Sequence, residues 1–135
     1  SYVGGTGGTG NSTITFANTL TTIFSASPIT ALSGERYLIY YNASFNPGTT
    51  GTSINTTILR NVNEGGATNV INGPLGLTTS GIGATKCYAP SANYTISGSY
   101  VDVPGAGTIV YSVQAIADFS TTTSSNYSTM NVFKV

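Results

Sequence analysis

The sequence predicts an all-β protein, an antiparallel sandwich of about eight strands. β-branched and aromatic residues, which fit a pleated sheet, are frequent. Apolar and polar residues alternate along several segments, and none keeps the 3.6-residue helical period for about ten residues. Turn signals built from Gly, Pro and Asn recur roughly every 8–15 residues, a spacing typical of sandwiches and barrels. This pattern suits a jelly roll; an immunoglobulin-like sandwich, the main rival, usually has a core Trp that this chain lacks.

Strands are predicted, in chain order, at 12–18 with a continuation after a bend at 20–25, then at 36–45, 53–61, 68–71, 82–90, 94–103, 107–119 and 127–135. Two of them alternate most clearly. In 36–45 one face carries Tyr37, Ile39, Tyr41, Ala43 and Phe45. In 107–119 one face carries Ile109, Tyr111, Val113, Ala115, Ala117 and Phe119. Alternation of this kind indicates one face packed in a core and one face in water or against a partner.

Loops and turns separate these strands. Asn46-Pro47-Gly48 ends the strand at 36–45, and Pro104-Gly105 ends the strand at 94–103. The segment 121–125 is predicted to be a polar loop. Residues 1–11 are Gly-rich and are predicted to be a flexible lead-in or the end of a shaft, so the head domain is expected to span 12–135.

Charged residues are scarce: four are basic, four are acidic, and there is no histidine. They are Glu35, Arg36, Arg60, Glu64, Lys86, Asp102, Asp118 and Lys134. Most enzymes depend on His, Asp, Glu and Lys, and no two acids here are close in sequence, so no catalytic residue, metal site or cofactor is expected. Zero net charge argues against nucleic acid as a partner. No apolar stretch is long enough for membrane insertion by a helix.

Cysteine and tyrosine give no assigned ligand site. The single cysteine, Cys87, is interpreted as a buried side chain or as a link to a partner chain. Three tyrosines lie on apolar strand faces and are expected in the core or at subunit contacts: Tyr37, Tyr41 and Tyr111. Four others lie nearer to loops and are candidates for recognising a ligand: Tyr88, Tyr94, Tyr100 and Tyr127.

Three stretches resemble the trimeric jelly rolls of the tumour-necrosis-factor (TNF) and complement-globular-head type. They read SGERYLI at 33–39, TTILRN at 56–61 and GTIVYSVQA at 107–115. The closing apolar strand, at the extreme end of the chain, is also placed as in that family. The resemblance implies a jelly roll that assembles as a homotrimer. It also implies a head domain carried on a fibre, as in virus or phage spikes and spore-surface filaments.

The two clearest strands carry more apolar residues than one face can hold. Leu38, Tyr40, Val110 and Ile116 lie opposite the main apolar stripes and are the candidate subunit-interface residues. In a monomer they would be exposed, whereas a closed assembly would bury them.

These observations favour a non-catalytic head domain of a viral or phage fibre or spike. Such a domain would form a trimer on an upstream shaft of the same chain, attach to a host-surface glycan or protein receptor, and lie at the extracellular or virion surface. The alternatives are a structural trimerising tip of a bacterial or spore surface filament and a carbohydrate-binding module of a larger protein. A small capsid jelly roll is disfavoured because the chain shows no basic arm.

Overall fold

The computed structural model describes residues 2–7, 13–14, 21–47, 53–65, 67–69, 85–88, 94–117, 121–123 and 128–135. These residues form twelve strands: β1 (Tyr2–Gly7), β2 (Thr13–Ile14), β3 (Thr21–Ser25), β4 (Ile29–Ala31), β5 (Tyr37–Pro47), β6 (Ser53–Val62), β7 (Ala67–Asn69), β8 (Thr85–Tyr88), β9 (Tyr94–Asp102), β10 (Gly107–Ala117), β11 (Thr121–Thr123) and β12 (Thr129–Lys134). Parts of the predicted strands, such as 15–18, 70–71 and 118–119, lie outside the described residues.

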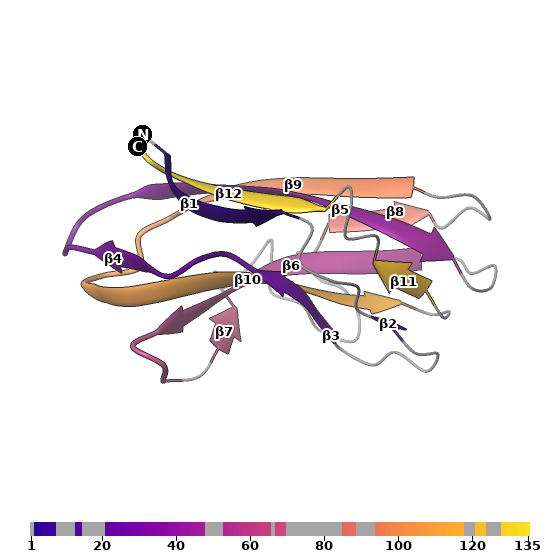
Figure 1. Ribbon diagram of the computed structural model, residues 1–135, viewed down its shortest axis with the longest axis horizontal. Helices are drawn as coiled ribbons and strands as arrows, with labels where there is room; N and C mark the ends of the chain where they lie inside the picture. The colour runs from indigo at the N-terminus through magenta and orange to yellow at the C-terminus, as the bar shows by residue number, and fades with distance from the viewer. Residues whose placement is uncertain are drawn as a thin grey trace.

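The strands form two antiparallel sheets that stack face to face. The first sheet runs β1-β12-β5-β11-β2, and β9 pairs with the other edge of β5. The second sheet runs β3-β10-β6-β7, with β4 also paired to β10 and β8 also paired to β6. Figure 1 shows the sheets as two layers, with β1, β12 and β9 in one and β4, β10 and β3 in the other.

Several short strands share one edge of a long strand, which explains the strand count. β12 and β11 lie along the same edge of β5, β3 and β4 along the same edge of β10, and β7 and β8 along the same edge of β6. Each sheet is therefore only about four strand positions wide. The predicted antiparallel jelly-roll sandwich of about eight strands is confirmed.

Three strands lie where the sequence pattern predicted none. Tyr2–Gly7, part of the predicted lead-in, forms β1 and pairs with β12. Ile29–Ala31 forms β4 between two turn signals, and Thr121–Thr123 forms β11, so the predicted polar loop at 121–125 was wrong there. β4 and β11 pair with the long strands β10 and β5, and β1 pairs with β12, which has the same length as β1. Backbone hydrogen bonding to a neighbour outweighs the weak local preference in all three.

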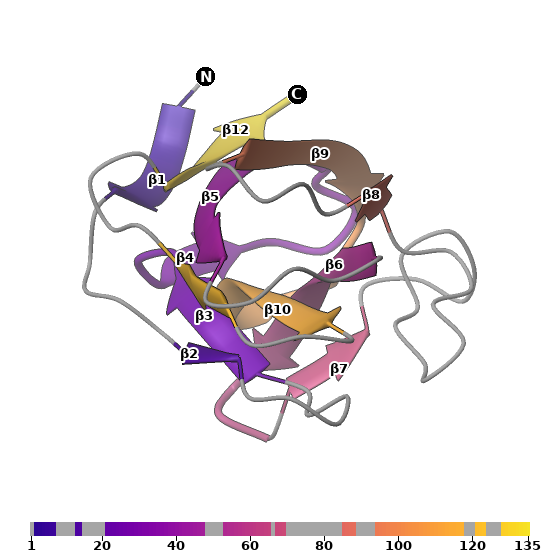
Figure 2. The same ribbon diagram turned by 90° about the vertical axis from the view of Figure 1, so that its right-hand side faces the viewer.

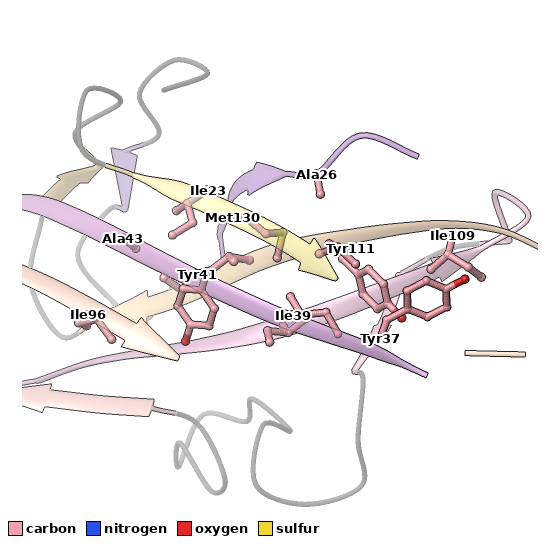
Figure 3. Packing of buried hydrophobic residues seen from close by; sticks show 14 of the residues in the cluster. Ile23, Ala26, Tyr37, Ile39, Tyr41, Ala43, Ile96, Ile109, Tyr111 and Met130 are labelled. Carbon is pink, nitrogen blue, oxygen red and sulfur yellow. The ribbon is translucent and has the colours of Figure 1, made fainter. Parts of the chain in front are cut away.

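The core fills the space between the sheets. The inner stripe expected on β5 is buried, with Tyr37, Ile39, Tyr41, Ala43 and Phe45 at 2% exposure or less, and so is the described part of the stripe expected on β10, whose Ala117 and Phe119 side chains lie outside the described residues. From β10 they meet Ile109, Tyr111, Val113 and Ala115. Figure 3 shows Tyr37, Ile39 and Tyr41 extending toward the side chains of the facing sheet. The inner faces are thus closed by the chain itself, so a partner has to bind at an outer face, an edge or an end of the sandwich.

The two ends of the sandwich differ in what they carry. Tyr2 pairs with Phe133, and Tyr37 pairs with both Lys134 and Asp102, so the first and last strands reach the same end. Figure 1 shows the N and C ends together there. Figure 2 looks at the sandwich from its opposite end and shows the two layers of strands one above the other. We name the first of these the terminus-bearing end.

Gly98 is required by close packing rather than by backbone conformation. A Cβ atom at this position of β9 would lie 2.7 Å from the ring and hydroxyl of Tyr41. The Tyr41 ring is fully buried, and its hydroxyl is 2.5 Å from the Thr56 hydroxyl on the facing sheet. Gly98→Ala is therefore expected to lower the free energy of unfolding by about 1–3 kcal/mol, measured by urea denaturation. Ser99→Ala, at the exposed neighbour, is the control and should change it by less than about 0.5 kcal/mol.

Candidate functional site

The outer face of the first sheet carries a row of apolar side chains. Because alternate residues of β5 point into the core, Leu38 and Tyr40 point outward. Leu38 lies between Phe133 of β12 and Val101 of β9, and Phe133 pairs in turn with Tyr2 of β1. We name Tyr2, Phe133, Leu38 and Val101 the apolar row. It crosses four neighbouring strands without a charged residue.

Much of this row is open to solvent. Tyr2 is 59% exposed and Val101 is 39% exposed, while Leu38 and Phe133 are half-buried. The Tyr2 and Phe133 rings meet edge to face, with centroids 5.8 Å apart. Such an edge-to-face pair holds both rings in place. A contiguous apolar surface of this kind marks an interaction site, in contrast to scattered single residues.

A neutral hydrogen-bond network lies beside the row, nearer the opposite end of the sheet. Its centre is Asn42 of β5, whose Oδ1 accepts hydrogen bonds from the Tyr40 hydroxyl, at 3.3 Å, and from the Ser97 hydroxyl. The Asn42 Nδ2 donates to the Thr129 hydroxyl at 3.4 Å. We name these four residues the Asn42 network. It joins β12, β5 and β9 through side chains and contains no ionisable carboxylate or amine.

Asp102 links the two sheets inside the terminus-bearing end. The Nη1 of Arg60, on β6, donates to both oxygens of Asp102, at 2.7 and 2.8 Å. The Tyr111 hydroxyl, on β10, donates to Oδ2 at 2.7 Å. Asp102 is buried, so its charge needs these partners. Burial, and then the hydrogen bond to Asp102, raise the pKa of Tyr111 above its ordinary range.

Glu35 makes a second link at the same end. Its Oε1 accepts a hydrogen bond from the Leu32 backbone N–H at 2.6 Å and from the Tyr37 hydroxyl at 2.9 Å. Its Oε2 forms an ion pair with Lys134 of β12. These three hydrogen bonds lower the Glu35 pKa from 4.5 to about 2, and the bond from Lys134 has the largest effect, ahead of those from Leu32 and Tyr37. Burial, and then the bond to Glu35, raise the pKa of Tyr37.

A groove of about 570 Å³ lies beside this second link. Its aliphatic lining includes Val3 of β1, Ile29 of β4 and Leu32, and the Glu35–Lys134 ion pair forms its polar side. Glu35 and Asp102 are both held by hydrogen bonds, so neither is placed as a free acid or base. Among the described residues, no group of three His, Cys, Asp or Glu could hold a metal ion. No helix in that part of the chain could cross a membrane.

The candidate interface residues do not share one surface. Leu38 and Tyr40 lie together on the outer face of the first sheet. Val110 pairs with Asn61 of β6 and lies on the outer face of the second sheet. Ile116 is in β10, but its side chain lies outside the described part of the structure. One flat contact with a partner can therefore bury Leu38 and Tyr40 or Val110, but not all three.

The candidate ligand-binding tyrosines gain no support as a group. Tyr100 is half-buried on β9 and packs against the core, so it is not on a loop. Tyr88 and Tyr94 are in strands, but the structure does not describe their side chains. Tyr127 lies wholly outside the described residues. Cys87 is in β8, and its side chain also lies outside.

Sequence reasoning missed most of the apolar row. Val101 and Phe133 alternate with core residues of β9 and β12, and this alternation is a usable signal. Tyr2 is in a Gly-rich segment that gave no strand signal. The Asn42 network depends on strand register, which the sequence did not specify.

The comparisons with known proteins show the fold. The chain is similar to the Eiger TNF of S. frugiperda, with a TM-score of 0.61, 12% identity, and coverage of 99% of this chain and 91% of that one. The chain is also similar to murine APRIL, with a TM-score of 0.57 and 12% identity over the whole of both chains. A protein of the infectious bursal disease virus Gx strain matches with a TM-score of 0.56 and 15% identity. This match covers 98% of this chain but only 30% of the viral chain.

No protein-family model matches the chain, and no curated protein matches it in sequence. At these identities the likeness concerns the fold alone. The chain has the jelly-roll fold of the TNF type, which a protein of a virus also contains. The resemblance noted in the sequence is thereby confirmed at the level of fold.

The Glu35 contacts generate a pH prediction. Because the folded-state pKa is lower than the ordinary value, ionised Glu35 stabilises the fold above about pH 4.5, and this contribution is lost as the pH falls toward about 2. Glu35→Gln is therefore expected to lower the free energy of unfolding at pH 7 and to weaken its decline between pH 4.5 and 2. Urea denaturation at a series of pH values measures both. Glu64→Gln, in the exposed β6–β7 turn, is the control and should keep the wild-type decline; equal slopes for all three proteins would contradict the prediction.

Proposed function

We propose that this chain is the non-catalytic head domain of a viral or phage fibre or spike, which trimerises and attaches to a host-surface receptor, either a glycan or a protein. The observation that carries the proposal is the exposed apolar row on the first sheet. A domain with zero net charge and a flat apolar sheet face is prone to association unless a specific partner covers that face.

Self-association in a closed ring covers the row on every copy. Closed cyclic assembly leaves no apolar face open, whereas open association would produce filaments. Leu38 and Tyr40, on this face, are the interface residues of the proposal, together with Phe133 and Val101. The TNF-type fold supports a ring of three. Interfaces of this obligate kind bury on the order of 2,000 Å² or more.

The two ends of the head would then have different roles. Any upstream shaft leaves from the terminus-bearing end, where β1 begins. The described charged residues Glu35, Arg60 and Asp102 also lie at that end and bond within the fold. In this proposal the receptor contacts the opposite end, through neutral hydrogen bonds and aromatic stacking. The head lies at the virion surface or otherwise outside the cell.

A structural tip of a bacterial or spore surface filament is the remaining alternative. It would use the same apolar row and the same ring of three, but it would bind no receptor. Binding of the isolated domain to candidate host cells and to a glycan array distinguishes the two. Absence of binding by a correctly assembled trimer would favour the structural tip.

The interface proposal predicts that Leu38→Asp separates the subunits. The wild type should have a mass of about 41 kDa, three times the 13.8 kDa of the chain, by light scattering at a few micromolar. Burying an unpaired carboxylate costs several kcal/mol, and about 4 kcal/mol corresponds to roughly a thousandfold weaker association. Leu38→Asp should therefore give a folded 13.8 kDa monomer.

Val110→Asp is the matched control, because it places the same charge on the outer face of the second sheet. It should leave the trimer intact, because the proposal places both contacts that each subunit makes in the ring at the first sheet. Dissociation by Val110→Asp but not by Leu38→Asp would move the interface to the second sheet. A monomeric wild type would remove the trimer and most of the argument for a fibre head.

The receptor proposal predicts weak dependence on salt. Contacts made by neutral groups are little affected by Debye screening, so receptor affinity should change by less than about threefold between roughly 50 and 500 mM salt. Titration of the trimer against a receptor-bearing cell or an array glycan at both salt concentrations measures this. A steep loss of affinity at high salt would indicate charge steering and would contradict the proposed mode of recognition.

A further inference from the structure

The apolar row does not by itself determine how copies of the chain are arranged. Aliphatic and aromatic surfaces pack against one another in several relative rotations with similar energies. A face that carried only Tyr2, Phe133, Leu38 and Val101 would therefore tolerate dimers, trimers and larger rings. Something else on the same face has to penalise the wrong arrangements.

The Asn42 network has the geometry for this role. Asn42 is half-buried at the centre of the first sheet, beside the row and on its outer face. An amide oxygen accepts two hydrogen bonds and an amide nitrogen donates two. The two bonds from Tyr40 and Ser97 occupy the Oδ1 of Asn42, whereas the bond to Thr129 uses one N–H of Nδ2. Within the described residues, the second N–H points to no protein acceptor and remains available.

Covering this face makes that remaining N–H decisive. In water it is solvated, but a partner subunit would remove the water. Only an arrangement that places an acceptor of the partner opposite Nδ2 keeps the group hydrogen-bonded, and every other arrangement leaves a buried donor unsatisfied. The partners Tyr40, Ser97 and Thr129 bond through hydroxyls, which donate as well as accept, so turning the amide over keeps the three bonds. It only moves the unpaired donor hydrogens onto the hydroxyls, and a partner still has to supply an acceptor for them. A single buried Asn acts in this way in coiled coils, where it selects register and subunit number at some cost in stability.

We infer that Asn42 determines the subunit number and rotational register of the assembly, through the unpaired donor of its hydrogen-bond network and an acceptor on a second copy of this chain. This inference rests on the proposed trimer. It assigns different tasks to the two parts of the face: the apolar row supplies affinity, and the Asn42 network supplies the choice among arrangements.

Asn42→Leu tests the inference, with native mass spectrometry of purified protein as the measurement. Removing the amide adds apolar surface, so association should persist. The trimer fraction should nevertheless fall by at least about twofold, with dimers and larger species in its place. Thermal unfolding of the same sample should not shift to lower temperature. If Asn42→Leu does not fold, Asn42→Thr takes its place, because Thr also lacks the amide and favours strands. The expected result is the same: a mixture of assembly masses instead of a uniform trimer.

Asn131→Leu is the matched control. Asn131 lies on the same face, opposite Tyr40, and outside the Asn42 network. The same substitution there adds the same apolar surface and also removes a side-chain amide, but it leaves the Asn42 network intact, so a uniform trimer should remain if that network selects the arrangement.

The outcomes separate the inference from the proposed function. A uniform trimer for both Asn→Leu variants would overturn the role of Asn42 and leave the trimeric head intact. Mixed masses for both would show that added apolar surface alone disturbs the assembly, which would also overturn the role of the amide. A monomeric wild type would instead overturn the proposed trimer, and the inference with it.

Discussion

Strand β5 has apolar side chains on both of its faces, and a two-layer sandwich can cover only one of them. Because the side-chain period of a strand is two, Tyr37, Ile39 and Tyr41 enter the core while Leu38 and Tyr40 must point outward. A slip of one residue would exchange the two sets. The core therefore fixes the register of β5, and the register of β9 and β12 on either side then assembles the apolar row. The outer surface is a consequence of how the inner one packs.

Four of the six charged side chains that the structure describes form ion pairs within the fold. Asp102 joins the sheets through Arg60 and Tyr111, and Glu35 holds the start of β5 to β12 and to the end of β4. A buried ion pair contributes little net stability, but it is costly to break, so it opposes arrangements in which the sheets slide. Farther along the sandwich the link between sheets is neutral, from Tyr41 to Thr56. The outer face is left with few charges with which to steer a partner.

Alternation and turn residues sufficed to predict the sandwich and both inner stripes, because burial of β5 and β10 imposes a period that local sequence displays. The same signal placed Leu38 and Val110 on outer faces, but it could not say that these faces belong to different sheets. That distinction depends on pairing between strands far apart in the chain, such as β5 with β9 and β10 with β6. Strand β1 was missed because Gly4, Gly5 and Gly7 have low strand preference, and only pairing with β12 makes the segment a strand.

A surface without charges has to obtain specificity from shape and from neutral hydrogen bonds. Ion pairs select partners over long distances and lose effect in salt, whereas an amide acts only on contact and is insensitive to salt. The Asn42 network is suited to the second mode, since three of its bonds are made within one subunit before any partner arrives. Preorganisation of this kind reduces the entropy lost on association. It also concentrates discrimination in the donors of the network that remain unpaired, so the polar part of the face can decide how subunits meet although the apolar row supplies most of the affinity.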